Sequence, residues 1–142
     1  MRADSGQMQQ VFSNILLNAS QSMAFPGSGR EDSGSLPRER KLVIRTHFCE
    51  AREDSFAGHP SLAGPFIRIV IEDSGRGIAP ENLSQIFDPF FSTKGTGEGT
   101  GLGLYIVSGI LKKYGAQYHL ESSEGCGTTF TIDFPLSEGG KF

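Results

Sequence analysis

Apolar residues return at regular intervals along the chain, and their spacing predicts most of its secondary structure. Between residues 8 and 23 they recur every three or four positions, which predicts one long amphipathic helix. Residues 41–48 and 66–72 are rich in alternating β-branched side chains, as half-buried strands are. Residues 102–115 return to helical spacing, and this helix is expected to end with Gly115 as its C-cap.

The remaining predicted elements are a short helix and a hairpin. Pro80 at a first helical position predicts a short helix through about Ile86. Residues 117–122 and 128–134 alternate on either side of the turn sequence EGCG, which predicts a β-hairpin. In this order the elements predict an α+β fold, a two-layer α/β sandwich whose mixed, mainly antiparallel sheet is covered by helices on one face. Residues 1–142 are expected to form a single domain.

Composition argues against several classes of function. The formal net charge is −3 and the 13 lysines and arginines are scattered, so we expect no nucleic-acid binding. No apolar run approaches the roughly 20 residues of a membrane span, and no signal-peptide pattern is present, so we expect no direct membrane contact. Cys49 and Cys126 have the spacing of neither a metal site nor a disulfide framework, which fits a cytoplasmic setting.

A polar stripe runs along the first predicted helix. Gln10, Asn14, Asn18 and Gln21 follow one another at spacings of four, four and three, so their side chains share one face. For a helix taken at random, a solvated face is the better interpretation. The flanking apolar residues favour a buried helix whose amides line a pocket, where an amide oxygen suits magnesium that also binds nucleotide phosphates.

An acidic residue stands at the end of the second predicted strand, in the sequence IEDSGRGI. An ordinary turn would explain Asp73 followed by Gly75 and Gly77. The alternative is a buried Asp73 carboxylate that accepts the exocyclic amine of adenine while the glycines let the backbone pass close to the base. Guanine carries an oxygen at that position, so such a carboxylate would discriminate against it.

Glycine occupies every second position from Gly95 to Gly103, in GTGEGTGLGLYIV. The stretch matches neither a Walker loop nor GxGxxG, and glycine-rich loops are often plain linkers. Directly before a helix, it instead predicts a flexible lid whose amides wrap a triphosphate. Lys94 could reach a terminal phosphate, although by itself it would be interpreted as a surface lysine.

Five short blocks resemble one known family in its own order. QVFSNILLNA resembles the N box, DSGRGI the G1 box, FDPFFSTK the F box, GTGLGL the G2 box and GCGTTF the last glycine box. These are the boxes of the catalytic, ATP-binding domain of bacterial sensor histidine kinases, members of the GHKL ATPase superfamily. The F and G2 blocks look most like the nitrogen-regulation type. The resemblance covers nearly the whole chain and implies the Bergerat fold with a glycine-rich ATP lid.

The resemblance implies a role for each matching position. Asn18 would be the magnesium ligand, Asp73 the adenine reader with Thr129 near its bridging water, and Lys94 a phosphate contact and catalytic residue. The implied ATP-binding positions are Asn14, Asn18, Gln21, Asp73, Gly75, Gly77, Ile78, Phe91, Lys94, Gly97, Gly99, Thr100, Gly101, Leu102, Gly103, Leu104 and Thr129.

Two positions on the first helix bear on the chemistry. Gyrase-like relatives carry a water-activating glutamate where this chain has Asn14, and an amide cannot take a proton. Asn14 is therefore expected to be a catalytic-site residue that favours phosphoryl transfer over hydrolysis. Many sensor kinases carry Lys or Arg where this chain has Gln21, which weakens the case for a phosphate contact there.

The phosphoacceptor is expected to lie outside this chain. His47, His59 and His119 lack the H-E/D pattern of a phosphoacceptor helix. We therefore expect a fragment of a longer kinase, monomeric in isolation and inactive in autophosphorylation alone. Its partners would be a histidine-bearing dimerisation domain of the same kinase and a downstream response regulator. Two alternatives remain open: a GHKL serine kinase of the anti-sigma type, and a docking module that has lost nucleotide.

Overall fold

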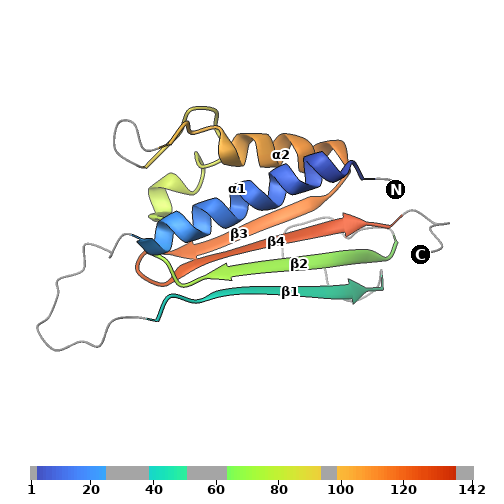
Figure 1. The fold of residues 1–142 in the computed structure, drawn as a ribbon, viewed down its shortest axis with the longest axis horizontal. Coiled ribbons are helices and arrows are strands. Elements are labelled where there is room, and N and C mark those ends of the chain that lie inside the picture. The colour runs from blue at the N-terminus through green and yellow to red at the C-terminus, as the bar shows by residue number, and fades with distance from the viewer. Residues whose placement is uncertain (1–2, 25–38, 51–63, 94–98, 137–142) are drawn as a thin grey trace, which may run out of the picture.

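A computed structural model of the chain describes residues 3–24, 39–50, 64–93 and 99–136. Two helices lie on one face of a four-stranded sheet (Figure 1). In chain order the elements are α1 (Ser5–Ala24), β1 (Leu42–Cys49), β2 (Phe66–Asp73), the 3-10 turn η1 (Pro80–Asn82), α2 (Gly103–Lys113), β3 (Gln117–Ser123) and β4 (Gly127–Pro135). This is the predicted two-layer α+β sandwich.

The described sheet is antiparallel throughout, in the order β1-β2-β4-β3. Its register sets Asp73, the last residue of β2, opposite Thr128 near the start of β4. Side chains alternate between the two faces of a strand, so Ile71 and Phe130, which pair, point to the same face. The end of β2 that carries Asp73 therefore lies beside the beginning of β4.

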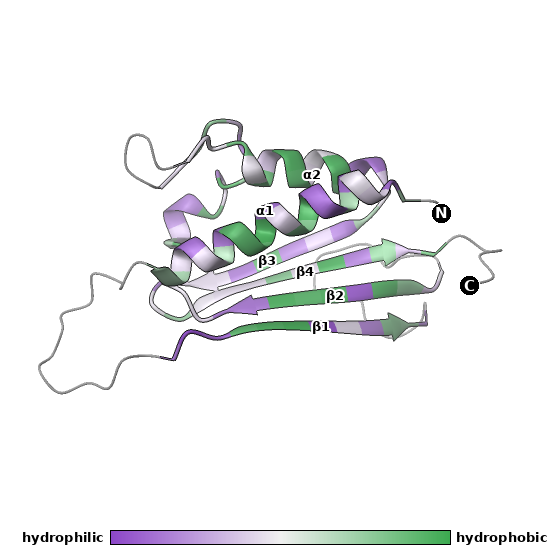
Figure 2. Ribbon diagram, viewed as in Figure 1, coloured by the Kyte–Doolittle hydropathy of each residue, from purple (hydrophilic) through white to green (hydrophobic). Residues whose placement is uncertain are grey.

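The core fills the space between the helices and the sheet. Leu111 and Val107 of α2, Val11 of α1 and Ile132 of β4 are fully buried there. Figure 2 shows these helices as alternating apolar and polar bands, because only one side of each helix faces the sheet. Burial of such side chains contributes about 1.5–3 kcal/mol each, so the hydrophobic face of each helix fixes its position over the sheet.

Both helices have well-formed ends. Asp4 caps α1, since its side chain accepts a hydrogen bond from the Gln7 amide at 2.8 Å. At the end of α2, Gly115 has φ +64 and the Ala116 amide donates to the Leu111 carbonyl, as in a Schellman motif. The capping role predicted for Gly115 is confirmed. The predicted helix over 80–86 is shorter, with only η1 helical and turns following it.

The opposite face of the sheet carries polar and apolar side chains, and one edge of the described sheet is exposed. Arg68 and Asp133 form a bidentate ion pair on the outer face with both contacts at 2.8 Å. On the helix-facing side of β1, Ile44 is 53% exposed and Phe48 is 61% exposed. Figure 1 shows why: β1 is the strand farthest from α2, beyond the cover of the helices.

Candidate functional site

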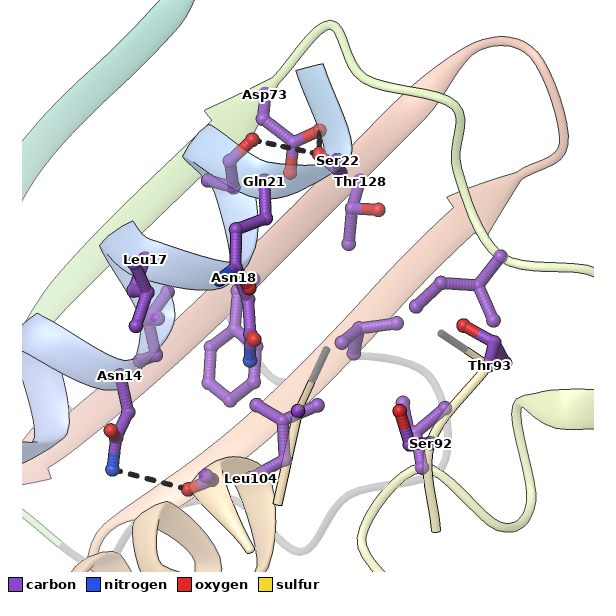
Figure 3. Close-up of a pocket in the computed structure, with 18 of the residues that line it drawn as sticks. Asn14, Leu17, Asn18, Gln21, Ser22, Asp73, Ser92, Thr93, Leu104 and Thr128 are labelled. Atoms are coloured by element: carbon purple, nitrogen blue, oxygen red, sulfur yellow. Dashed lines mark hydrogen bonds between the residues drawn. The ribbon is translucent and has the colours of Figure 1, made fainter. Parts of the chain in front are cut away.

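A pocket of about 390 Å³ opens between α1, the end of β2 and the start of α2. Its lining mixes amide and carboxyl groups from α1 and β2 with apolar side chains from the sheet. Residues that follow β2 and precede α2 form the remaining wall. In Figure 3 the labelled side chains of α1 and Asp73 border the same space from different elements. The pocket therefore depends on the packing of both layers.

The polar stripe of α1 faces this pocket. Asn14, Asn18 and Gln21 all line it, with Asn18 between the other two in Figure 3. The Asn14 side-chain amide donates to the carbonyl of Gly103 at 3.3 Å and so connects α1 to the first turn of α2. The solvated-face interpretation is wrong for these three residues. Gln10 is exposed and is not among the pocket-lining residues.

Asp73 stands at one end of the pocket, held from several sides. Its Oδ1 accepts a hydrogen bond from the Gly75 amide at 2.9 Å and one from the Ser22 hydroxyl at 3.0 Å. Burial raises the pKa of the Asp73 carboxyl above its ordinary value, while the hydrogen bonds from Gly75, Ser22 and the Thr128 backbone act in the opposite direction. Asp73 is thus a partly buried acceptor, anchored to the fold.

The pocket lining also has an apolar section. Ile78 and Phe91 line it, together with Ile71 and Phe130 of the sheet. The backbone at Ile78 is held in place, because its amide donates a hydrogen bond to Ser122 Oγ of β3 at 2.9 Å. Gly77, with φ +70, also lines the pocket. Apolar walls next to a fixed acceptor suit a flat ring that carries a hydrogen-bond donor.

The segment before α2 is joined to the middle of the F-box sequence. The Phe90 amide donates to the Gly101 carbonyl at 3.0 Å, and both residues have positive φ, +67 at Phe90 and +65 at Gly101. A Cβ at position 101 would lie 2.4 Å from the Phe90 carbonyl carbon. Only glycine fits that position without displacing the backbone of Phe90.

The structure brings most of the predicted site residues to the pocket. Those that line it are Asn14, Asn18, Gln21, Asp73, Gly77, Ile78, Phe91, Gly99, Thr100, Gly101, Gly103 and Leu104. Gly75 and Leu102 are next to lining residues without being among them. Lys94 and Gly97 lie outside the described residues.

The prediction for β4 was displaced by one residue. Thr128 lines the pocket and pairs with Asp73, whereas Thr129 pairs with Glu72 and is absent from this lining. Since consecutive strand residues point to opposite faces, Thr129 cannot share the face of Thr128. The sequence alone does not reveal which of two adjacent threonines faces inward.

The lining residues that sequence reasoning did not single out include Ser22 and Arg76. Ser22 was detectable, because it continues the spacing of four from Asn14 and Asn18 on the same helix face. Arg76 lies between the two glycines of the G1 sequence, and its guanidinium donates to Thr93 Oγ1 at 3.3 Å. Among the described lining residues, Arg76 is the cationic side chain.

The donor chemistry of the pocket bears on metal binding. Within the described parts of the chain, no three His, Cys, Asp or Glu side chains gather as a self-contained metal site would require. Asn18 and Gln21 instead supply neutral amide oxygens. Such a set fits a hard cation that keeps waters and takes its other ligands from phosphates, as Mg²⁺ does.

Comparison with known proteins identifies the family. Residues 3–138 match the family described as Histidine kinase-, DNA gyrase B-, and HSP90-like ATPase. The chain belongs to this family. The predicted GHKL identity is therefore confirmed, and the pocket is the candidate nucleotide site of an ATPase-family domain.

Individual relatives are sensor kinases. The chain is 35% identical over 136 residues to Sensor kinase CckA of Brucella abortus, covering 95% of this chain and 13% of that sequence. It is 34% identical over 137 residues to Sensor histidine kinase ZraS of Escherichia coli, covering 96% of this chain and 23% of that sequence. The domain thus spans less than a quarter of the length of these two relatives.

Solved structures have the same fold. The mycobacterial sensor histidine kinase MprB aligns with a TM-score of 0.64 at 23% identity, covering 94% of this chain and 72% of that one. Full-length ShkA in complex with AMPPNP aligns with a TM-score of 0.61 at 25% identity, covering 94% and 22% of the two chains. In the described part of this domain, no helix is long and apolar enough to cross a membrane.

Proposed function

We propose that this domain binds Mg-ATP in the pocket and donates the γ-phosphate to a histidine on a separate dimerisation domain of the same kinase. The observation that carries the proposal is the convergence of Asp73 and the α1 amides on one pocket of an ATPase-family domain. A carboxylate at one end and neutral oxygens at the other match the two ends of a nucleotide.

The adenine would occupy the end of the pocket at Asp73. Its 6-amino group would donate to the carboxylate, and Ile78 and Phe91 would contact the faces of the ring. Thr128, opposite Asp73 in the sheet, takes the place first assigned to Thr129 beside the bridging water. Guanine would set its 6-oxo group against the carboxylate, so the proposal includes preference for adenine.

The triphosphate would extend along α1 toward the start of α2. Asn18 would bind the metal through its amide oxygen, and the metal would neutralise charge on the phosphates when bound. The N-terminus of α2, with backbone from Gly99 to Leu104, would contact the phosphates. Lys94 and Gly97 are proposed phosphate contacts on the sequence resemblance alone.

Transfer to a protein acceptor is favoured over hydrolysis by Asn14. This residue donates its side-chain amide to the Gly103 carbonyl and carries no proton-accepting group. An attacking water would therefore find no base at that position. An imidazole needs little such assistance, since it is already nucleophilic near neutral pH.

The acceptor is proposed to come from another domain. The register sets His47 opposite Arg68 and His119 opposite Thr131, on the face of the sheet away from the helices. Neither histidine lines the pocket. His59 lies outside the described residues. We further propose that residues 1–142 form a single domain that is cytoplasmic and, in isolation, monomeric. The longer kinase to which it belongs would pass phosphate to a response regulator.

The test offers the domain a separately purified, histidine-bearing dimerisation domain with radiolabelled ATP and Mg²⁺. We expect acid-labile phosphate on that partner, lost when its histidine is replaced by glutamine and reduced about 10-fold or more by Asp73→Asn, which removes the adenine acceptor. Acid-stable phosphate on a serine of a partner would favour the serine-kinase alternative. Absence of any ATP binding would overturn the proposal in favour of a docking module.

A further inference from the structure

Ser22, near the end of α1, contacts the adenine-binding carboxylate directly. Its hydroxyl lies 3.0 Å from Asp73 Oδ1, although the two residues are 51 positions apart in sequence. The same hydroxyl lies 2.8 Å from the carbonyl of Ala19, one turn back in α1, so its single hydrogen is shared between two acceptors, of which an ionised carboxylate is the stronger. Figure 3 shows Ser22 beside Asp73 at the end of the row formed by Asn14, Asn18 and Gln21.

The backbone around Asp73 closes on Ser22 as well. The Arg76 amide donates to the Ser22 carbonyl at 3.2 Å. A Cβ at position 75 would lie 2.1 Å from Ser22 Oγ and 2.7 Å from Asp73 Oδ1, so glycine is needed for the turn to approach the serine. The turn after β2 is thus joined to α1 by contacts that centre on Ser22.

We propose that Ser22 is a positioning residue for nucleotide recognition, whose hydroxyl holds Oδ1 of Asp73 and thereby directs the carboxylate toward the adenine amine. The inference rests on the proposed function of the pocket. With Oδ1 bonded to Gly75 and Ser22 together, rotation of the carboxylate would break two hydrogen bonds. Its orientation is therefore set before a ligand arrives.

The contact also bears on the charge of Asp73. Burial raises the pKa of Asp73, and the Ser22 hydrogen bond is among the contacts that lower it. A protonated carboxyl has lost acceptor capacity toward an amine, so the hydroxyl helps to keep the binding form populated. Without the hydroxyl, one of the contacts that lower the pKa of Asp73 is lost, so this pKa is expected to rise further.

Other charged groups surround Asp73 and must be held constant in a test. Arg76 lines the same pocket as Asp73. Asp73 also borders a second pocket, on the outer face of the sheet, which is lined by further charged residues. The described ones are Lys41, Arg45, Glu72 and Glu121. Ser20, exposed on the same helix, is a matched control because Ser20→Ala leaves all of these groups in place.

The experiment titrates the folded domain with a fluorescent ATP analogue and Mg²⁺ across acidic to neutral pH. Binding needs ionised Asp73, so affinity falls as pH drops through the pKa of that carboxyl. For Ser22→Ala we expect about 3- to 10-fold weaker binding at neutral pH, as one lost hydrogen bond would give, and a fall that begins at higher pH. Ser22→Thr keeps a hydroxyl, so its affinity should begin to fall at the same pH as in the unmodified domain. Ser20→Ala should match the unmodified domain.

Each other outcome overturns the inference. If the unmodified domain binds the ATP analogue and Ser22→Ala shows the same affinity and the same pH dependence of affinity, Ser22 has no positioning role and the proposed function stands. If Ser22→Ala weakens ATP and a 6-oxo purine triphosphate equally at every pH, its role is structural only. If the unmodified domain binds no ATP analogue at all, the proposed function fails, and this inference fails with it. Unfolding midpoints recorded for each variant restrict the comparison to folded protein.

Discussion

Asp73 has to serve two opposing physical requirements. Recognition of an amine needs an ionised acceptor, but partial burial disfavours the ionised form and raises the pKa of this carboxyl. The hydrogen bonds from Gly75 and Ser22 offset part of that cost. Residues kept in an unfavourable state for function commonly reduce the stability of the fold. Asp73 is therefore expected to destabilise the domain when no ligand is bound.

Replacing Asp73 with asparagine should consequently stabilise the ligand-free domain at neutral pH. A carboxyl whose folded pKa lies above its unfolded pKa favours folding most below the unfolded pKa, and that advantage is lost as pH rises through the folded pKa. Thermal unfolding should show Asp73→Asn above the unmodified domain at pH 7, with the difference shrinking or reversing as pH falls from the raised pKa of Asp73 to that of an ordinary aspartate. A midpoint lower than that of the unmodified domain at pH 7 would contradict this account.

At the scale of elements, α2 is joined to the F-box segment by one crowded junction. Phe90 adopts φ +67, which is unusual for a bulky residue, and the residue is 77% exposed. Its amide bond to the Gly101 carbonyl holds the two chain segments together directly before α2 begins. Because both segments line the pocket, this junction couples the start of α2 to the site.

Gly101→Ala should disturb this junction, whereas Gly109→Ala should not. At position 101 the new methyl meets the Phe90 backbone at 2.4 Å and the φ of +65 is strained, so we expect a loss of about 1–3 kcal/mol in stability. Position 109 is exposed in the middle of α2 with nothing within 4 Å, so alanine should add about 0.5–1 kcal/mol through helix propensity.

Urea unfolding of both variants provides the measurement. The opposite signs separate the local geometry at position 101 from the general effect of glycine replacement. Equal stabilisation by both substitutions would mean that the Phe90–Gly101 contact does not constrain the chain.

Element type was predictable because local spacing determines it, and long-range pairing was not. The apolar repeat predicted α1 and α2, and Gly115 marked the end of α2, since these signals lie within a few neighbouring residues. Thr129 was predicted to lie near Asp73, but Thr128 occupies that position. Which threonine faces the pocket is set by strand register, which depends on the pairing of β2 with β4. The contact of Ser22 with Asp73 joins residues 51 apart and has no local signature beyond helix spacing.

At the scale of the whole molecule, the pocket is shared between both layers of the sandwich. α1 contributes the amides, β2 the carboxylate, and the segment leading into α2 the backbone proposed to meet the phosphates. α1 and α2 also contact each other away from the pocket, where the Tyr114 hydroxyl, directly after α2, donates to Gln7 Oε1 near the start of α1 at 2.6 Å. A ligand that spans the pocket would therefore oppose separation of the helices from the sheet.

Mg-ATP should for this reason stabilise the domain as one cooperative unit. At a concentration about 100-fold above its dissociation constant, a ligand adds about 2.7 kcal/mol, which corresponds to a rise in Tm of roughly 10 °C for a domain of this size. Asp73→Asn should start from a higher Tm and lose at least about half of this rise, because a 10-fold weaker affinity leaves about 1.4 kcal/mol at the same concentration. Asn18→Ala should retain only the part that ATP produces with EDTA in place of Mg²⁺, because its metal ligand is gone. Thermal scans with ATP plus Mg²⁺, ATP plus EDTA, and Mg²⁺ alone distinguish these contributions. An equal shift in all three proteins would place the nucleotide elsewhere, since neither end of the pocket would then contribute to its binding.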